Sequence, residues 1–505
     1  MRCEHFEAGR CRSCTLLPVP MGARIAQAQA RIADLLAPFA MAAGDALSAS
    51  PVTGGPGAAS VAGSPRSASV SGVDAAPARS FRTARVGPSA GAPGIWHSPI
   101  VGPETGFRNK AKMVVSGTAS QPVLGIRDEA GEGVDLRDCP LYPAPIHRLL
   151  EHLPALIRRA QVAPFDVQRR RGDLKHVLVT CGDGGALMVR FVLSSPKSIA
   201  RIAEHLPSLQ AAVPGVEVVF ANINPGHTAV LEGPEEIHIA GADFLRVTQG
   251  RIPLRVRPQS FLQTNTAVAS RLYAQVGAWI DELAEARAGA EPAATAHAAA
   301  APEPLRVWDL FCGVGGFALH CAPPGTASAG APAAVACAAA APAGVASAPL
   351  AEVPRTAPTG VPRTGATGMR GAAAARPYRA ARSVTGVELS DQAIASAAET
   401  AAELGLGADF IAADAFAWAR AQAERTGPPD VLIVNPPRRG IGEAMAAWIE
   451  ASGIPDVVYS SCNPATLARD LAAMPSMRVA SAQLLDMFPH TAHAEVLTRL
   501  VRTAG

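Results

Sequence analysis

The chain has 505 residues, 49% of them hydrophobic, which is enough to bury several cores and suggests about two to four domains. Its 45 Lys and Arg against 42 Asp and Glu give a net charge of +3, which is only a weak indication of a nucleic-acid partner. No apolar run is long enough to span a bilayer, and residues 1–5 lack the apolar core of a signal peptide, so we expect a cytoplasmic protein without a membrane partner.

Three stretches dominated by Ala, Gly, Pro, Ser and Thr interrupt the chain, near residues 43–94, 286–304 and 322–382. They carry too few regularly spaced large apolar residues to offset the entropy of ordering a chain, so we expect them to be disordered insertions. Around them the sequence predicts an amino-terminal segment with a helix at 1–42, a central domain at 95–250 and a third domain at 251–505.

Three of the nine cysteines, Cys3, Cys11 and Cys14, lie in the amino-terminal segment with the spacing C-x7-C-x2-C. The segment is too short and polar to fold alone, and disulfides are disfavoured in a reducing compartment. A bound metal is therefore the better candidate for holding the segment in a fixed structure. A fourth thiolate is needed, and Cys139 is the candidate because a Cys followed by Pro recurs among cluster ligands. The spacing leaves a zinc site, a four-iron cluster and unligated thiols open.

The central domain is rich in predicted strands, at 176–180, 186–193 and 216–220, with an apolar helix near 147–160. This pattern is typical of an α+β unit with an antiparallel sheet, which we interpret as a substrate-binding platform. Basic clusters at Lys110 with Lys112, at 169–171 and at Arg438 with Arg439 could neutralise phosphates, although each alone is also compatible with ordinary solvated surface.

The third domain opens with a short apolar strand at 307–311, followed by the loop Cys312-Gly313-Val314-Gly315-Gly316 and a helix from Phe317. Glycines let the backbone approach a ligand closely, and the amino terminus of a helix offers unpaired N–H groups to a carboxylate or phosphate. This strand, loop and helix indicate a nucleotide-type cofactor site that includes Gly313.

Two acidic residues follow the next predicted strands. The strand 383–387 ends in Glu388, whose carboxylate can accept both hydroxyls of a ribose, and Asp414 is placed to reach an adenine. Gly313 and Glu388 are 75 positions apart instead of the usual ~20, a difference that disappears if residues 322–382 loop out. The order of strand, glycine loop and acids predicts a class I Rossmann-like α/β sheet that binds S-adenosylmethionine at the carboxyl ends of its strands.

The strand 431–434 leads into Asn435-Pro436-Pro437-Arg438. Rigid prolines at a strand end fix an Asn side chain over the cofactor. An Asn-Pro-Pro also occurs in amino-group methyltransferases, where an aromatic residue follows and stacks on the target base. Arg438 stands at that place, which argues against amino methylation, the first competing interpretation.

The strand 456–461 leads to Cys462, with Asn463 as a cap and Pro464 at the first position of a helix. The helix dipole favours the thiolate of a cysteine just before a helix amino terminus, so Cys462 is the candidate nucleophile. The alternative is a buried structural cysteine. Cys312 is the rival nucleophile, but a residue inside the cofactor loop is badly placed to reach beyond the methyl group.

Taken together, these segments resemble the bacterial family of RNA uracil-C5 methyltransferases. The resemblance covers nearly everything outside the three insertions, which are its main departure, and rests on residues 3–14, 107–113, 257–265, 309–317, 435–440, 460–464 and 487–495. Within the family, the motifs look most like those of the branch that modifies uridine 747 of 23S ribosomal RNA.

The resemblance implies residue roles as well as an activity. It implies Cys462 as nucleophile and Glu495 as general base. It implies a 4Fe–4S cluster on four cysteines, Cys3, Cys11, Cys14 and Cys139. It also implies that S-adenosylmethionine is held by Gln263, Phe311, Glu388 and Asn435, to which we add the motif residues Asp309, Gly313 and Asp414.

The implied chemistry explains why these groups are needed. Carbon 5 of uracil becomes nucleophilic when the Cys462 thiolate adds to carbon 6, and Glu495 then removes the surplus proton from carbon 5. Both faces of the base are used, so we expect a flipped uridine in single-stranded RNA, a monomeric enzyme and no DNA partner. The same chemistry on another ribosomal or transfer RNA uridine, and a non-catalytic iron-sulfur RNA-binding protein, are the alternatives.

Overall fold

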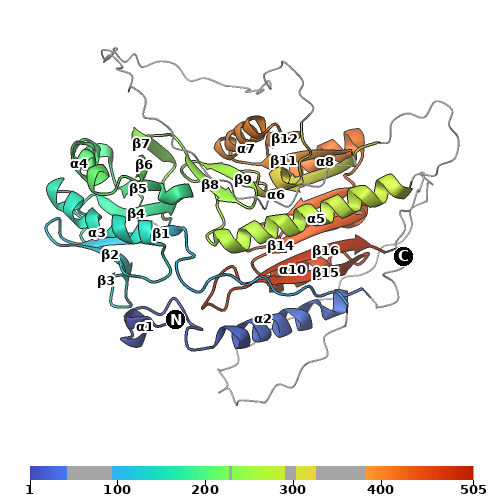
Figure 1. The fold of residues 1–505 in the computed structure, drawn as a ribbon, viewed down its shortest axis with the longest axis horizontal. Coiled ribbons are helices and arrows are strands. Elements are labelled where there is room, and N and C mark those ends of the chain that lie inside the picture. Colours follow the sequence, from blue (N-terminus) through green and yellow to red (C-terminus); the bar gives the residue numbers. More distant parts are fainter. Residues whose placement is uncertain (42–93, 227–229, 291–302, 326–380, 504–505) are drawn as a thin grey trace, which may run out of the picture.

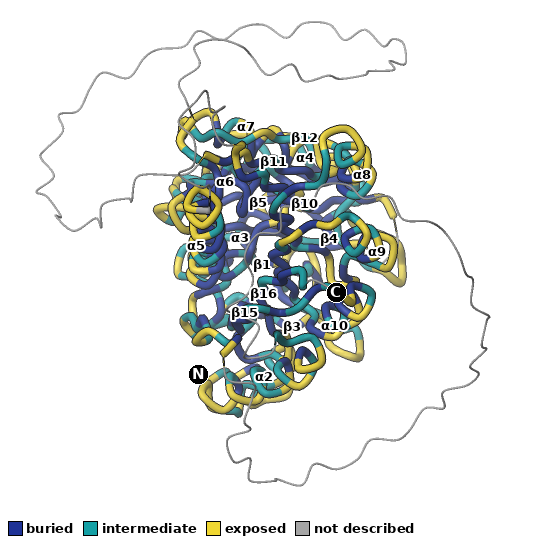
Figure 2. Tube along the Cα trace, turned by 90° about the vertical axis from the view of Figure 1, so that its right-hand side faces the viewer, coloured by how far each residue is buried: buried dark blue, intermediate teal, exposed yellow. Residues whose placement is uncertain are grey.

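The computed structural model describes residues 1–41, 94–226, 230–290, 303–325 and 381–503. Most of the three predicted insertions lies outside these ranges. Two seven-stranded sheets, each flanked by helices, form the body of the molecule, and the amino-terminal segment runs beneath both in the view of Figure 1. Figure 2 shows the buried residues concentrated along the strands and the exposed ones on the outer sides of the helices.

The central sheet has the strand order β3-β2-β1-β4-β5-β6-β7. Its strands are β1 (Lys110–Gly117), β2 (Pro122–Arg127), β3 (Gly133–Asp135), β4 (Leu174–Cys181), β5 (Leu187–Leu193), β6 (Val216–Ile223) and β7 (Glu235–Gly241). The expected antiparallel sheet is wrong for one pair, because β5 and β6 run parallel. The helix α4 (Ile199–Ala212) forms the crossover that a parallel connection requires.

One face of the central sheet is covered by α4 and by α3 (Ala144–Arg159). Apolar residues recur in α3 at a helical spacing, so that Ile146, Leu149, Leu153 and Ile157 form one buried stripe. This stripe packs against the sheet as a separate core cluster. Short 3₁₀ turns complete the unit, η3 (Asp183–Gly185) and η4 (Pro196–Ser198).

The carboxyl-terminal sheet has the order β12-β11-β10-β13-β14-β16-β15. Its strands are β10 (Leu305–Leu310), β11 (Arg382–Glu388), β12 (Ala408–Ala412), β13 (Val431–Val434), β14 (Asp456–Ser461), β15 (Met477–Leu485) and β16 (Glu495–Arg502). The first five strands in this order are parallel to one another, and β16 and β15 are antiparallel. This is the predicted Rossmann-like sheet of a methyltransferase, extended by an antiparallel edge.

Alternate residues of the parallel strands enter two different cores. Leu432 and Val434 of β13 face a core with α2 (Met21–Leu36), α8 (Ala415–Thr426), α9 (Glu443–Ser452) and α10 (Pro464–Ala472). Val431 and Ile433 face a core with α5 (Thr266–Ala290) and α6 (Gly316–Cys321). A strand buried on both faces explains the continuous apolar run of residues 431–434.

The two units are joined by the hairpin β8 (Leu245–Gln249) and β9 (Ile252–Val256), which packs between the central sheet, α6 and α7 (Asp391–Leu404). The domain boundary expected at 250/251 falls in the turn of this hairpin. The helix α5 continues to Ala290 and β11 begins at Arg382, so both elements enter the ends of the stretches expected to be insertions.

The amino-terminal segment contains a short helix α1 (Glu4–Glu7), α2 and a 3₁₀ turn η1 (Ala37–Phe39). α2 packs against α10 and β15, and residues 96–100 lie beside β15 through isolated bridges to Ala482 and Leu485. Among the helices of the described ranges, none is long and apolar enough to cross a membrane.

Candidate active site

The carboxyl ends of four neighbouring parallel strands meet at one edge of the carboxyl-terminal sheet. Glu388 ends β11, and Phe311, Asn435 and Cys462 directly follow β10, β13 and β14. Parallel strands end at a common edge, so the fold places the predicted donor-binding residues and the predicted nucleophile along one rim.

The glycine loop after β10 contains three residues in the left-handed region of the backbone. Phe311, Gly313 and Gly315 all have positive φ, at 65°, 54° and 82°. A Cβ on Gly315 would lie 3.0 Å from both Ala397 Cβ and Phe410 Cε1, whereas a Cβ on Gly313 would meet no described atom within 4 Å. The loop is therefore packed tightly behind Gly315 and faces open space in front of Gly313, where a ligand can approach the backbone.

Asp309 lies completely buried at the base of this loop. Its Oδ2 accepts a hydrogen bond of 2.9 Å from the Ala318 N–H, while Oδ1 has no hydrogen-bond partner in the described structure. Burial raises the pKa of Asp309 to about 8, assisted by the nearby Glu388 charge and opposed by the Ala318 hydrogen bond. A bound cationic group such as an ammonium would supply the missing partner of Oδ1 and favour the ionised form of this carboxyl.

Glu388 folds back onto the backbone at the same rim. Its carboxylate accepts hydrogen bonds from the N–H groups of Gly313 at 3.3 Å, Leu389 at 2.9 Å and Ser390 at 3.2 Å. Asp414 is exposed and caps α8, because its Oδ1 accepts from the Ala417 N–H at 2.8 Å. Thus the Glu388 carboxylate is hydrogen-bonded to the glycine loop, and Asp414 has a capping role that the sequence interpretation did not include.

Gln263 lies at the junction of the two units and is buried. Its main-chain carbonyl oxygen accepts hydrogen bonds from Asn109 Nδ2 at 3.1 Å and from Gln249 Nε2 at 2.9 Å. Asn109 directly precedes β1 and Gln249 ends β8, so the central unit and the hairpin together hold this segment in place. Two residues earlier, Phe261 is 67% exposed.

Cys462 is half-buried between β14 and α10. Pro464 occupies the first turn of α10 as predicted. Asn463 is at the N-cap position, but the predicted side-chain cap is wrong, because its Nδ2 donates instead to the Arg438 carbonyl at 3.1 Å. Burial raises the pKa of the Cys462 thiol, the Glu495 charge raises it further, and nearby Arg438 opposes both. Burial thus opposes the thiolate that the position before the helix amino terminus favours.

Glu495 opens β16, the strand that pairs with β14, and is fully buried. The Ser460 hydroxyl donates a hydrogen bond of 2.6 Å to its Oε1. Burial raises the pKa of Glu495 to about 7, against the lowering effect of Ser460. Sequence reasoning missed Ser460, although a polar residue two positions before Cys462 in an apolar strand was a usable signal, since alternate residues share a face.

The rival thiol, Cys312, is buried in the glycine loop, and burial raises its pKa well above the ordinary value. A thiol that is protonated and enclosed is a poor nucleophile. This favours Cys462, which borders a cavity.

The four predicted cluster cysteines belong to two parts of the chain, Cys3, Cys11 and Cys14 in the amino-terminal segment and Cys139 after β3. Burial, together with the charges of the other three cysteines, raises the pKa of Cys14 to about 11. Burial, with smaller contributions from Cys3 and Cys11, likewise raises the pKa of Cys139 to about 11. No group of three or more candidate ligands that could hold a metal ion occurs within the described ranges.

The chain has sequence relatives among known proteins. Residues 429–503 match the family model of tRNA (Uracil-5-)-methyltransferase. The chain is 35% identical over 506 residues to the 23S rRNA (uracil(747)-C(5))-methyltransferase of Halothiobacillus neapolitanus, covering 99% of this chain and 100% of that protein. It has the same identity and coverage with the protein of that name from Escherichia coli O139:H28.

A solved structure shares the fold. The Pyrococcus abyssi tRNA (uracil-54, C5)-methyltransferase in complex with S-adenosyl-L-homocysteine has a TM-score of 0.53 and 20% sequence identity, covering 80% of this chain and 79% of that one. At this identity the likeness supports the fold alone.

Proposed function

The chain belongs to the family of RNA uracil-C5 methyltransferases, and from that membership we propose that it methylates carbon 5 of uridine 747 in 23S ribosomal RNA through a covalent Cys462 adduct. The observation that carries the proposal is the placement of Cys462 and Glu495 at the ends of two paired strands, on the rim that also bears the glycine loop. One thiol and one carboxylate of this kind are what addition to a pyrimidine and removal of its proton require.

The first step is addition of the Cys462 sulfur to carbon 6. The sulfur electron pair forms the S–C6 bond, and the electrons of the C5–C6 double bond move through carbon 5 to the carbonyl oxygen, giving an enolate. The raised pKa of Cys462 means that the thiolate is a minor form in the free protein. Arg438 lowers this pKa and is therefore positioned to stabilise the thiolate.

S-adenosylmethionine, when bound, would supply the electrophilic methyl group: the enolate electrons would form the bond from carbon 5 to the methyl as the sulfur–methyl bond breaks and S-adenosylhomocysteine leaves. Glu495 then takes the proton that remains on carbon 5, the C5–C6 double bond re-forms, and the Cys462 thiolate leaves. A pKa of about 7 gives this carboxylate a base strength matched to neutral pH. Ser460 occupies Oε1, which leaves Oε2 to accept the proton.

The residues around the glycine loop fit the donor. The partnerless Asp309 Oδ1 suits the ammonium of the methionine part, and the open space before Gly313 admits a ligand against the backbone. Glu388 would accept the ribose hydroxyls, and Gln263, Phe311 and Asn435 would complete the donor site. Asp414 remains the candidate for the adenine, although it also caps α8.

The resemblance to the family implies a 4Fe–4S cluster on the four cysteines, and the cluster enters the proposal on that ground. The pKa values of Cys14 and Cys139 are each raised in part by the charges of other cysteines of this set. Each thiolate of a cubane cluster would bind a different iron.

The RNA substrate is assigned from the named relatives, which act on 23S ribosomal RNA. A transfer RNA uridine is the second candidate, because the matching family model is described by that substrate. We infer a flipped base in a single-stranded loop, since addition and methylation need both ring faces. A monomer in the cytoplasm without a DNA partner completes the proposal.

The experiment is methylation of matched transcripts by the purified, iron-reconstituted chain. A 23S fragment containing uridine 747 should acquire one 5-methyluridine, located by mass spectrometry, and the same fragment with cytidine at that position should not. Methylation of a transfer RNA in preference to the fragment would overturn the choice of substrate, and methylation of an amino group would overturn the chemistry.

A further inference from the structure

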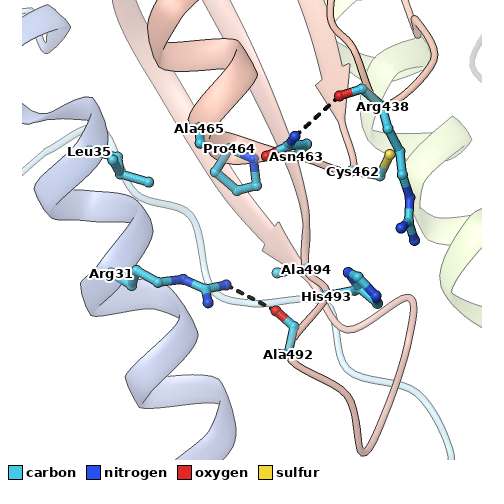
Figure 3. A pocket seen from close by; sticks show the side chains of 10 residues that line it. All are labelled: Arg31, Leu35, Arg438, Cys462, Asn463, Pro464, Ala465, Ala492, His493 and Ala494. Carbon is cyan, nitrogen blue, oxygen red and sulfur yellow. Dashed lines mark hydrogen bonds between the residues drawn. The ribbon is translucent and has the colours of Figure 1, made fainter. Parts of the chain in front are cut away.

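A cavity of about 340 Å³ lies directly beside Cys462. Four parts of the chain form its walls: α2, the loop after β13, the start of α10 and the loop that precedes β16. Figure 3 shows the residues that line it, which are Arg31, Leu35, Arg438, Cys462, Asn463, Pro464, Ala465, Ala492, His493 and Ala494.

The cavity adjoins the nucleophile and reaches beyond it to α2. Of the residues assigned to the reaction, Cys462 and Arg438 line it, whereas Glu495, Gln263 and Asn435 are not among its described lining residues. Arg31 and Leu35 of α2, which have no assigned part in the chemistry, form its opposite wall. A volume of this size lies at the lower end of the range for small-ligand pockets, which suits one nucleotide.

The walls carry basic groups and no carboxylate among the described lining residues. Arg31 reaches across from α2, and its Nη2 donates to the Ala492 carbonyl at 3.1 Å. Arg438 approaches from the opposite side, with its main chain held by Asn463 Nδ2 at 3.1 Å. In Figure 3 the Arg31 and Arg438 side chains enter from opposite walls, with His493 between Arg438 and Ala492. Arginines on opposite walls of one cavity, with no acid among the described lining residues, indicate an anionic ligand.

Apolar side chains form the remaining wall. Leu35 of α2 faces Pro464 and Ala465 at the start of α10. A surface of this kind can pack against the face of a sugar or base, while the arginines bind the phosphate.

We propose that this cavity is a subsite for the nucleotide adjacent to the target uridine, with the phosphate between them bound by Arg31 and Arg438. The inference rests on the proposed function, and it deepens it by assigning an RNA contact to the amino-terminal helix α2. Arg31 is then a positioning residue, because it holds the RNA chain while the next base enters the site beside Cys462.

The position of α2 is itself fixed to the loop before Glu495. Arg24 Nη1 is 2.7 Å from His490 Nδ1, and the Leu16 N–H donates to the His490 carbonyl at 2.8 Å. Arg24 also pairs with Glu104 at 2.9 Å. The cysteine-bearing segment thus supplies a rigid support for the Arg31 wall of the subsite.

The test is a thermodynamic cycle that combines the Arg31→Gln substitution with the replacement of one RNA phosphate by a neutral linkage, and measures the effect of each change on binding. The probe is a short single-stranded RNA with one uridine, made with or without a methylphosphonate on either side of it. The matched control is Arg425→Gln, which removes an exposed arginine from α8, a helix that contributes no described residue to the cavity lining. Binding is measured by fluorescence anisotropy at several salt concentrations, and 5-methyluridine is measured in parallel.

We expect Arg31→Gln to weaken binding about tenfold and to reduce the slope of log Kd against log salt by about 0.7. A neutral linkage on one side should weaken binding by the wild type at least as much, and should weaken Arg31→Gln less than the wild type, because only the Arg438 contact then remains to be lost. Arg31→Lys should recover part of the affinity, and Arg425→Gln should behave as wild type.

Two results would overturn the subsite. In one, the losses from Arg31→Gln and from each neutral linkage are additive. In the other, Arg31→Gln lowers kcat with unchanged RNA affinity and salt slope, which would mean that Arg31 acts through Ala492 on the loop before Glu495. Failure of the proposed function would look different, because the wild type would then form no 5-methyluridine on any RNA.

Discussion

Replacing Ser460 with Ala should shift the pH at which the proposed base operates. A hydrogen bond to a charged group contributes about 1.5–3 kcal/mol, and 1.36 kcal/mol corresponds to about one pKa unit. Ser460 donates to the carboxylate of Glu495 and lowers its pKa, which lies at about 7. Loss of the hydroxyl should therefore raise the pKa of Glu495 by about one to two units.

The direction of the pH shift follows from the role of the Glu495 carboxylate, which accepts a proton only when it is ionised. At pH 7 the ionised fraction should fall from about a half to about a tenth or less in Ser460→Ala. In the pH profile of the rate of adduct breakdown, the acid limb should accordingly move to higher pH by about one to two units. Tyr273, whose pKa burial raises and the Glu495 charge raises further, stays neutral in this range, and Cys462 titrates above it.

The assay is single-turnover conversion of a preformed protein–RNA adduct to free 5-methyluridine RNA, measured against pH. Starting from the adduct separates the Glu495 step from ionisation of Cys462. Ser461→Ala is the matched control, because the Ser461 hydroxyl bonds to the Asn463 backbone and not to Glu495. An acid limb of Ser460→Ala that coincides with that of the wild type would refute the assignment of Glu495 as the titrating base.

Further predictions concern the base, the donor loop and the cluster. Glu495→Gln should accumulate a covalent protein–RNA adduct on denaturing gels, and free turnover without an adduct would exclude it as base. Gly315→Ala should lower the free energy of unfolding by at least about 1–2 kcal/mol, because φ is positive and the new Cβ is crowded. The Cβ of Gly313→Ala enters open space, so this variant should lower the melting temperature less but should weaken S-adenosylmethionine binding in calorimetry. Cys139→Ser should reduce bound iron and sulfide in chemical analysis, and unchanged iron content would remove Cys139 from the ligand set.

Much of the carboxyl-terminal sheet was predictable because its signals are local. The apolar run before the glycine loop, the acid at the end of β11 and the Asn-Pro-Pro after β13 each sit within a few residues of the strand they mark. Parallel strands end at a common edge, so these local signals also placed the donor-binding residues together. The 75-residue separation of Gly313 and Glu388 did not prevent this, since adjacent strands need not be close in sequence.

Other features depend on contacts that a linear pattern does not carry. The parallel pairing of β5 with β6 follows from the crossover of α4, and strand-like periodicity is the same for either direction. The upward pKa shift of Cys462 arises from burial and from Glu495 across the strand pair, neither of which is visible in the helix-start motif. The wall formed by Arg31 requires α2 to pack beside α10, more than 400 positions away in the chain.

Release of tritium from RNA labelled at carbon 5 of uracil tests the central claim most directly. Wild-type chain with S-adenosylmethionine should release tritium in step with 5-methyluridine formation, because the hydrogen at carbon 5 is the one that Glu495 removes. Cys462→Ala should release none while still binding S-adenosylmethionine in calorimetry. Tritium release by Cys462→Ala at the wild-type rate would contradict covalent catalysis by this residue.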